Sequence, residues 1–267
     1  MGIKFFKKNK LDISNPLPVI TITDSVATDT GEAFTNLMRN RDNNSGWMTT
    51  GSADAGNTTL EIDFIDSINF DSIILIGHNL KAFTLKYWNG SSWVDFSTPV
   101  AETTNTKSTS YFSFNLVTSQ KIQLIVTGTQ VADAEKVIKQ FIVSEILGTF
   151  NEEPEVIPTI DRDRKVTKFL SGKSFISKTA GAFNCVIKKK VVADASDLTL
   201  AETLFDSYEG FLVWICGGDE TQFEQVRRGY RLEDIFLMSC ANEYTPEFTD
   251  SRWAQGMELN LKLVEVN

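Results

Sequence analysis

The stretch from Leu60 to Phe96 constrains the fold more than any other part of this 267-residue chain. Residues 61–64 and 83–88 alternate apolar and polar side chains with period two, and residues 72–77 form a short apolar run between them. Asn89-Gly90 follows the last segment and suits a type I′ turn, in which both central residues have positive φ. Consecutive short strands without an intervening helical period predict an antiparallel sandwich or jelly roll.

Length and charge narrow the class of protein. A chain of 267 residues exceeds one typical domain, so we expect two. A net charge of −9 and a pI near 4.8 argue against nucleic acid or an anionic membrane as the main partner. No apolar run reaches the roughly eighteen residues of a membrane-spanning helix, so we expect no membrane insertion. Residues 1–8 are basic without a following apolar segment, which predicts no secretory signal.

The cysteines indicate a reduced protein. Cys185, Cys216 and Cys240 are an odd number, and none lies in a C-x-x-C spacing. Each has apolar neighbours in the sequence, which is typical of a small buried side chain. A disulfide framework is therefore not expected. A metal or iron–sulphur site is the alternative, for which the sequence shows no further ligands.

Four segments follow from the pattern. Residues 1–17 are expected to be a mobile or docking arm, and residues 18–150 a mainly β domain. Residues 151–158 are acidic and contain two prolines, which is typical of a linker. Residues 159–267 are expected to form a second β domain with one helix, for which the apolar face and the capping residues place the helix at 197–208.

The first domain resembles the discoidin-like, or galactose-binding-like, family. The resemblance covers about residues 18–150 and lies in the order of several landmarks: Asn40-x-Asp42-x-x-Ser45-Gly46-Trp47, Ile62-Asp63-Phe64, Phe70-Asp71-Ser72-Ile73-Ile74-Leu75, Gly77-His78-Asn79, a hairpin with Trp93, and a closing strand with Glu145. It implies an antiparallel jelly-roll sandwich. Loops at one end of that sandwich, residues 40–58, 78–82 and 98–110, would then form a carbohydrate- or receptor-binding site.

The same resemblance suggests roles for individual residues. Trp47 either packs into the end of the sandwich, which the family pattern favours, or stacks on a sugar. His78 and Asn79 either orient their loop or contact a ligand. Some family members hold a structural calcium between the loop before the tryptophan and the closing glutamate, which here implies Asp42 and Glu145, both oxygen donors. Asn40-Arg41 departs from the family's loop pattern and weakens that implication.

The second domain resembles the tail-tube-like fold of bacteriophage tail proteins, expected as a small β-sandwich or barrel over about residues 159–267. Together the two resemblances imply a structural component of a phage tail tip or distal tail. Such a protein would form a homo-oligomeric ring with other tail proteins, be made in the host cytoplasm and reside in the virion. The alternative is a carbohydrate- or host-receptor-binding module.

An enzyme is the least expected class. The chain has a single histidine, His78, so it offers too few histidines for a multi-histidine metal site and only one candidate for a Ser-His-Asp triad. The carboxylate pairs Asp63/Asp66 and Asp161/Asp163 lie on alternating strands or beside the linker, and solvated surface charge explains them better than glycosidase chemistry. No Gly-rich phosphate loop is present. We therefore expect a non-enzymatic protein without a catalytic residue.

Overall fold

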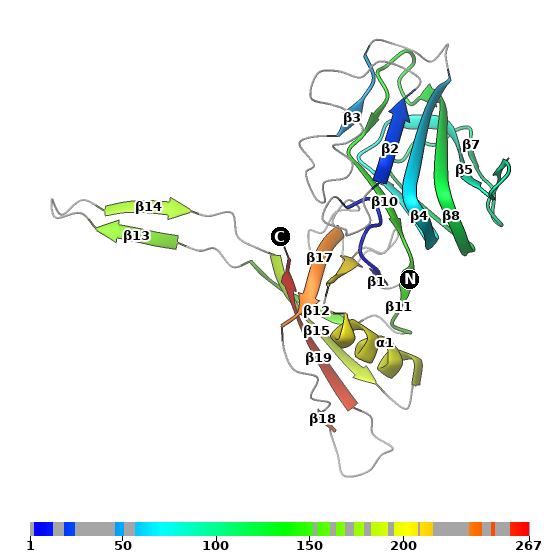
Figure 1. Cartoon of the computed structure of the whole chain (residues 1–267). Coiled ribbons are helices and arrows are strands. Elements are labelled where there is room, and N and C mark those ends of the chain that lie inside the picture. Colours follow the sequence, from blue (N-terminus) through cyan, green and yellow to red (C-terminus); the bar gives the residue numbers. More distant parts are fainter. Residues whose placement is uncertain are drawn as a thin grey trace. The chain divides into compact units, whose positions relative to one another are not determined.

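The computed structural model describes residues 3–12, 19–24, 46–50, 57–151, 154–160, 164–168, 174–178, 183–191, 195–207, 209–215, 235–241, 247–248 and 257–266. In chain order the elements are β1 (Lys4–Phe6), β2 (Val19–Asp24), β3 (Trp47–Met48), β4 (Thr58–Ile76), β5 (Leu80–Trp88), β6 (Trp93–Val94), β7 (Val100–Glu102), β8 (Thr109–Thr129), β9 (Val137–Ile138), β10 (Gln140–Ser144), β11 (Ile146–Thr149), β12 (Glu155–Ile160), β13 (Arg164–Lys168), β14 (Ser174–Lys178), β15 (Phe183–Val191), α1 (Ala195–Asp206), β16 (Phe211–Trp214), β17 (Ile235–Cys240), β18 (Glu247–Phe248) and β19 (Met257–Glu265). The prediction of a mainly β fold with one helix is confirmed (Figure 1).

The chain divides into two compact units. The sandwich unit is built mainly from residues 6–146, and the sheet unit from the described residues of 1–5, 147–217 and 236–267. The sandwich unit is thus inserted into the chain of the sheet unit. This division differs from the expected boundaries at 18–150 and 159–267, because the first residues of the chain belong with its last third.

Two long strands organise the sandwich unit. β4 and β8 pair antiparallel from Thr58↔Val126 to Ile76↔Thr109, and the register shifts between Asp63 and Ile68 and again between Phe70 and Ser72. Such irregularities bend a strand without ending it. The sequence predicts two separate strands at residues 61–64 and 72–77. The structure joins them, because the chain bends at these shifts and does not reverse there.

Each half of the bent pair belongs to a different layer. The β5 layer contains β2, the 58–63 half of β4, the 121–129 half of β8, and β5 with β6 and β7. The β10 layer contains β10 with the 68–76 half of β4 and the 109–119 half of β8. Phe83 of the β5 layer meets Phe112 of the β10 layer at 5.8 Å between ring centroids. Side chains of both layers form one buried core, as expected for a jelly-roll-like sandwich.

The sheet unit is an open sheet in the order β11-β1-β16-β17-β19-β15-β12, with β18 paired to β19. Helix α1 lies against it, since Ala201 and Leu198 pack on Leu259 of β19. β13 and β14 pair with each other as a separate two-stranded sheet. Over the described residues the path of the main sheet ends at β11 and β12, so this part of the chain forms an open sheet and not the barrel alternative.

The N-terminal residues differ from the expected arm. Lys4–Phe6 form β1, an interior strand between β11 and β16. Phe5 is fully buried and makes edge contacts with Phe150 at 5.5 Å and Phe211 at 6.1 Å. The basic character of the first eight residues suggested exposure, but the apolar Ile3, Phe5 and Phe6 among them are all buried. Burial of aromatic surface therefore determines where this segment lies.

In the part of the chain that the structure describes, no helix has both the length and the apolar character needed to cross a membrane.

Candidate binding face

Trp47 lies in the core of the sandwich unit. It is fully buried, and its strand β3 pairs with β9 through Trp47↔Ile138. Its side chain belongs to the same buried cluster as Phe83 and Phe141. The structure thus gives Trp47 the packing role that the sequence pattern favours, and a ligand cannot reach its ring without displacing the core.

His78 is a buried hydrogen-bonding residue at the bend after β4. Gly77 turns the chain there with φ of 62°, a conformation that favours glycine. The backbone nitrogen of Leu80 donates to Nδ1 at 3.2 Å, so Nε2 carries the proton and donates to Ser110 Oγ at 2.9 Å. Burial lowers the pKa of His78 to about 4. The neutral imidazole therefore joins the bend to β8.

The side chain of Asn79 also makes its hydrogen bonds within the protein. Its Nδ2 donates to the carbonyl oxygen of Glu135 at 2.6 Å, and its Oδ1 accepts from the backbone nitrogen of Val137 at 2.9 Å. Asn105 similarly donates to the carbonyl oxygen of Leu80 at 2.7 Å. The loops after β4, β7 and β8 are thus held together by hydrogen bonds to one another. Sugar contacts by His78 or Asn79 remain predictions.

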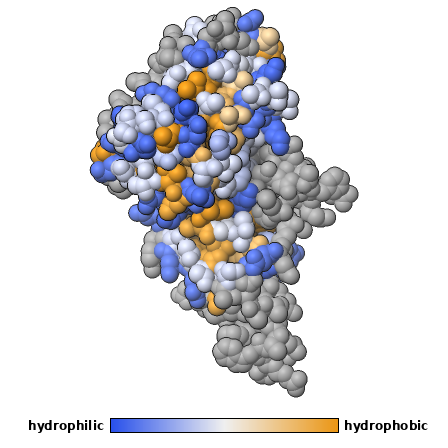
Figure 2. All heavy atoms as spheres, turned by 90° about the vertical axis from the view of Figure 1, so that its right-hand side faces the viewer, coloured by the Kyte–Doolittle hydropathy of each residue, from blue (hydrophilic) through white to orange (hydrophobic). Residues whose placement is uncertain are grey.

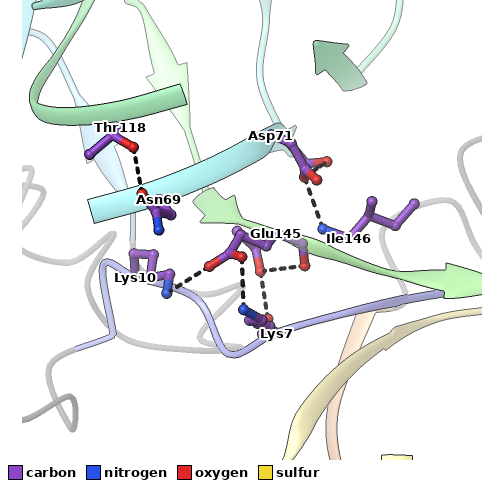
Figure 3. A network of polar contacts seen from close by, with 9 residues as sticks. Lys7, Lys10, Asn69, Asp71, Thr118, Glu145 and Ile146 are labelled. Atoms are coloured by element: carbon purple, nitrogen blue, oxygen red, sulfur yellow. Dashed lines mark hydrogen bonds and ion pairs between the residues drawn. The ribbon is translucent and has the colours of Figure 1, made fainter. Parts of the chain in front are cut away.

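Glu145 holds the N-terminal segment against β10. Lys7 Nζ lies 2.7 Å from Oε2 and Lys10 Nζ lies 3.3 Å from Oε1, as Figure 3 shows. Both carboxylate oxygens therefore face ammonium groups, an environment that disfavours a calcium ion. Asp42, the other expected ligand, lies outside the described residues, so the calcium site stays a prediction. The described residues contain no group of three or more His, Cys, Asp or Glu that could hold a metal.

A different surface presents two tryptophans to solvent. Along β5, Phe83 and Leu85 point into the core, so Thr84, Lys86 and Trp88 point outward. Trp88 pairs in register with Trp93 of β6, which places both indoles on the same outer face. Their rings meet edge to face at 5.5 Å, and both side chains are partly exposed. These two residues form an aromatic ridge at the edge of the β5 layer.

The hairpin that carries the ridge is not the predicted type I′ turn. Gly90 has φ of 100°, but Asn89 does not have a positive φ. Instead, Asn89 Oδ1 accepts hydrogen bonds from the backbone nitrogens of Ser91 and Ser92, at 3.0 and 2.9 Å. This side-chain capping stabilises a longer loop over residues 89–92. It leaves exposed hydroxyl and amide groups beside the indoles.

Charged pairs continue the same face across the sheet. Lys86 Nζ lies 3.6 Å from Asp95 Oδ1, and Lys121 Nζ lies 2.6 Å from Asp63 Oδ2. These four side chains are between 25% and 59% exposed, so ligands can reach them. Gln123 is buried between the two pairs and donates from Nε2 to Glu61 Oε1 at 2.7 Å. We call the ridge together with Lys86, Asp95, Lys121, Asp63 and Glu61 the platform.

The sequence contains the signal for the platform. The alternation over residues 83–88 separates Phe83 and Leu85 from Lys86 and Trp88, and the Asn-Gly pair predicts that a returning strand faces β5. Together they place Trp88 and Trp93 on a common outer face. The resemblance to the discoidin-like family instead predicted a site in the end loops, where the side chains of Trp47, His78 and Asn79 make contacts inside the protein.

No protein-family model and no curated protein matches this chain. Among solved structures it is similar over part of its length to chitosan-binding module 1 of a chitosanase/glucanase from Paenibacillus sp. IK-5, with 13% identity and a TM-score of 0.43, covering 51% of this chain and 98% of that one. It is also similar to the family 32 carbohydrate-binding module of Streptococcus pneumoniae EndoD, with 16% identity and a TM-score of 0.40, covering 52% and 99%.

A third similar structure is that of a Bacteroides thetaiotaomicron protein described as an alpha-L-fucosidase, with 13% identity and a TM-score of 0.42. The match covers 52% of this chain and only 28% of that protein. Identities and TM-scores of this size establish neither a family nor a ligand for this chain. The platform is therefore the feature of this chain that bears on its function.

Proposed function

We propose that this protein binds carbohydrate through the platform on the outer face of the β5 layer. The observation that supports this proposal is the partly exposed pair Trp88 and Trp93, which lie in register on one face of the sheet. Charged side chains extend the same face beyond them. No catalytic group enters this proposal, and the protein is a binding module rather than an enzyme.

The chemistry of a sugar matches such a surface. A pyranose ring has an apolar face of C–H groups and a rim of hydroxyls. An indole offers a flat apolar surface with one N–H donor. Lys121, Asp63 and Glu61 supply donors and acceptors close to the ridge. Figure 2 looks onto the side of the chain where Figure 1 draws β5 and β7, and hydrophobic residues there lie between hydrophilic ones.

The test is to compare two single variants of the whole chain for retardation in native gels containing soluble polysaccharides. Trp93→Ala removes half of the ridge. Thr104→Ala changes an exposed residue in the end loops that the sequence singles out. We expect Trp93→Ala to weaken binding at least tenfold and Thr104→Ala to leave it unchanged. Far-ultraviolet circular dichroism checks that both variants are folded. The opposite pattern would place the site at the end loops and contradict the platform.

A second candidate function is the structural one. The sheet unit offers β13 and β14 as a separate two-stranded sheet and leaves β11 and β12 at the ends of its main sheet. Strands at the ends of a sheet are common sites of contact between subunits. This supports a ring-forming component of a phage tail tip, assembled with other tail proteins in the virion. A tail-tube-like identity for the sheet unit is part of this proposal.

Light scattering combined with negative-stain images tests the second candidate. Closed rings of identical subunits would support it, since heterologous contacts close by symmetry. A strictly monomeric protein at high concentration would count against it. The two functions are compatible, because a sandwich unit on a tail ring could touch glycans of the host surface.

A further inference from the structure

The platform is a strip that crosses strands, and this shape defines its ligand if the proposed function holds. Trp93 is opposite Trp88, and Lys121 is opposite Asp63. Because Tyr87 pairs with Ile122, the next position along the ladder places Trp88 opposite Lys121. Directly opposite residues of antiparallel strands share one face. The four side chains therefore form one row from β6 through β5 and β8 to β4.

A second row runs beside the first. Val94 pairs with Tyr87, which places Asp95 opposite Lys86, and their ion pair confirms that both point outward. Lys86 is opposite Gln123, and Gln123 is opposite Glu61. Four adjacent strands span about 14 Å at the usual spacing of about 4.8 Å. This strip is longer than a single sugar ring and has the width of two rows of side chains.

Neither end of the strip is closed by the fold of the β5 layer. At one end β6 is an edge strand, paired only to β5 among the described strands. At the other end the register continues from Asp63 to Thr21 and from Glu61 to Thr23 of β2. Among the described residues of the β5 layer, the strip therefore meets no stop for a chain terminus. A ligand longer than the strip can continue beyond β6 at one end and toward β2 at the other.

The charges of the strip oppose an anionic ligand. Its two ammonium groups, Lys86 and Lys121, already face Asp95 and Asp63. Adding Glu61 gives three carboxylates against two ammonium groups, which leaves one negative charge. The whole chain is also acidic, with a net charge of −9. This net negative charge disfavours an anionic polysaccharide, whereas hydroxyl groups can both donate to the carboxylates and accept from the lysines.

We propose that the platform binds an uncharged, extended polysaccharide along its length, with the sugar chain lying across β6, β5, β8 and β4. The ridge stacks against one sugar ring, and the charged pairs hydrogen-bond the hydroxyls of the rings that follow. The site recognises internal stretches of the polysaccharide and does not select a chain end.

The first experiment measures charge preference with the full chain. Galactomannan, xyloglucan and dextran serve as uncharged probes, polygalacturonate as the anionic probe and chitosan as the cationic probe, all by retardation in native gels. We expect retardation by at least one uncharged polysaccharide and none by polygalacturonate. Binding confined to polygalacturonate or to chitosan would overturn the inference while leaving carbohydrate binding in place. No retardation by any probe would overturn the proposed function and the inference together.

The second experiment measures chain length by calorimetry, using oligosaccharides from one to six sugars prepared from the polysaccharide that binds. Affinity should rise at least tenfold between the monosaccharide and the tetrasaccharide. Asp63→Ala, at the β4 end of the strip, should weaken binding of the hexasaccharide at least fivefold. In this variant the affinity should also stop rising at a shorter oligosaccharide than in the unmodified protein. Asp63→Asn, which keeps an acceptor for Lys121, controls for folding. Equal affinity for the monosaccharide and the hexasaccharide would overturn the inference and leave the proposed function standing.

Discussion

The backbone nitrogen of Lys7 donates a hydrogen bond of 2.8 Å to the carbonyl oxygen of Glu145, and the Lys7 ammonium lies 2.7 Å from the Glu145 carboxylate. These two residues lie far apart in the sequence, near the beginning and the end of the sandwich unit. Asn9 strengthens the same junction, because its Oδ1 accepts from the backbone nitrogen of Val143 at 3.0 Å and its Nδ2 donates to the Phe141 carbonyl at 3.3 Å. The otherwise open edge of β10 is thereby covered by residues 7–11.

Asn9→Ala should destabilise the sandwich unit more than Glu145→Gln does. Asn9 is buried, and its loss leaves backbone groups of β10 without partners, at a cost of about 1–3 kcal/mol. The ion pairs of Glu145 involve lysines that are 49% and 28% exposed, so their removal should cost about 1 kcal/mol or less. Urea unfolding of both variants measures the difference. Only the effect of Glu145→Gln should shrink at high salt, and an equal or reversed order would contradict this account.

The free energy of unfolding should fall as the pH is lowered, because His78 binds a proton more readily in the unfolded chain. Its pKa is about 4 in the folded protein and about 6.5 in the unfolded chain, because burial disfavours the charged form. The unfolded state therefore binds the proton more readily, so this contribution is complete above pH 6.5 and is lost between pH 6.5 and 4. A shift of this size corresponds to about 3 kcal/mol. His78→Gln should show a flatter pH dependence in urea unfolding over that range.

The single histidine makes the pKa directly measurable. One pair of imidazole signals should titrate in the proton NMR spectrum of the whole protein, with a midpoint well below 6 if His78 stays buried. A midpoint near 6.5 would show that the imidazole is open to solvent and would remove the basis for this pH dependence.

Trp47→Ala should lower the free energy of unfolding by about 3–5 kcal/mol, the range typical of emptying a large core site. Trp47→Phe keeps an aromatic ring in the core and should cost less. Neither substitution removes a platform residue, so Trp47→Phe should bind polysaccharide as the unmodified protein does. Chemical denaturation and gel retardation on the same samples check both statements. Loss of binding in a folded Trp47→Phe protein would favour the sugar-stacking alternative.

Cys185 and Cys240 should resist alkylation in the native protein. Burial raises the pKa of each thiol to about 12, so almost no thiolate exists at pH 8. Cys185 is nearly inaccessible, and the Cys240 thiol also donates weakly to the Leu204 carbonyl at 3.7 Å. Iodoacetamide labelling followed by peptide mass spectrometry should find both unmodified in buffer and both modified in urea. Rapid labelling of Cys185 without denaturant would show that β15 is not packed as described.

Local pattern predicted much of the fold. The alternation in β5 and the apolar run in β4 identified strands, because period-two burial is a property of neighbouring residues. The burial of Phe5 could not be read in this way, since its partners Phe150 and Phe211 lie more than a hundred residues further along the chain. The pairing of Lys7 with Glu145 is equally non-local. For the candidate site, the sequence left both packing and ligand contact open for Trp47 and His78, because burial depends on the layers around them.

The position of β1 has a consequence for the order of folding during synthesis. Lys4–Phe6 are translated before the sandwich unit, yet their neighbours in the sheet, β11 and β16, are translated only after residues 7–145. The sandwich unit can complete its core while β1 still lacks both partners, and the long loop it closes makes that pairing slow. A nascent chain stopped after residue 146 would display Phe5 without its partners. Residues translated before the sandwich unit are thus among the last to reach their native contacts.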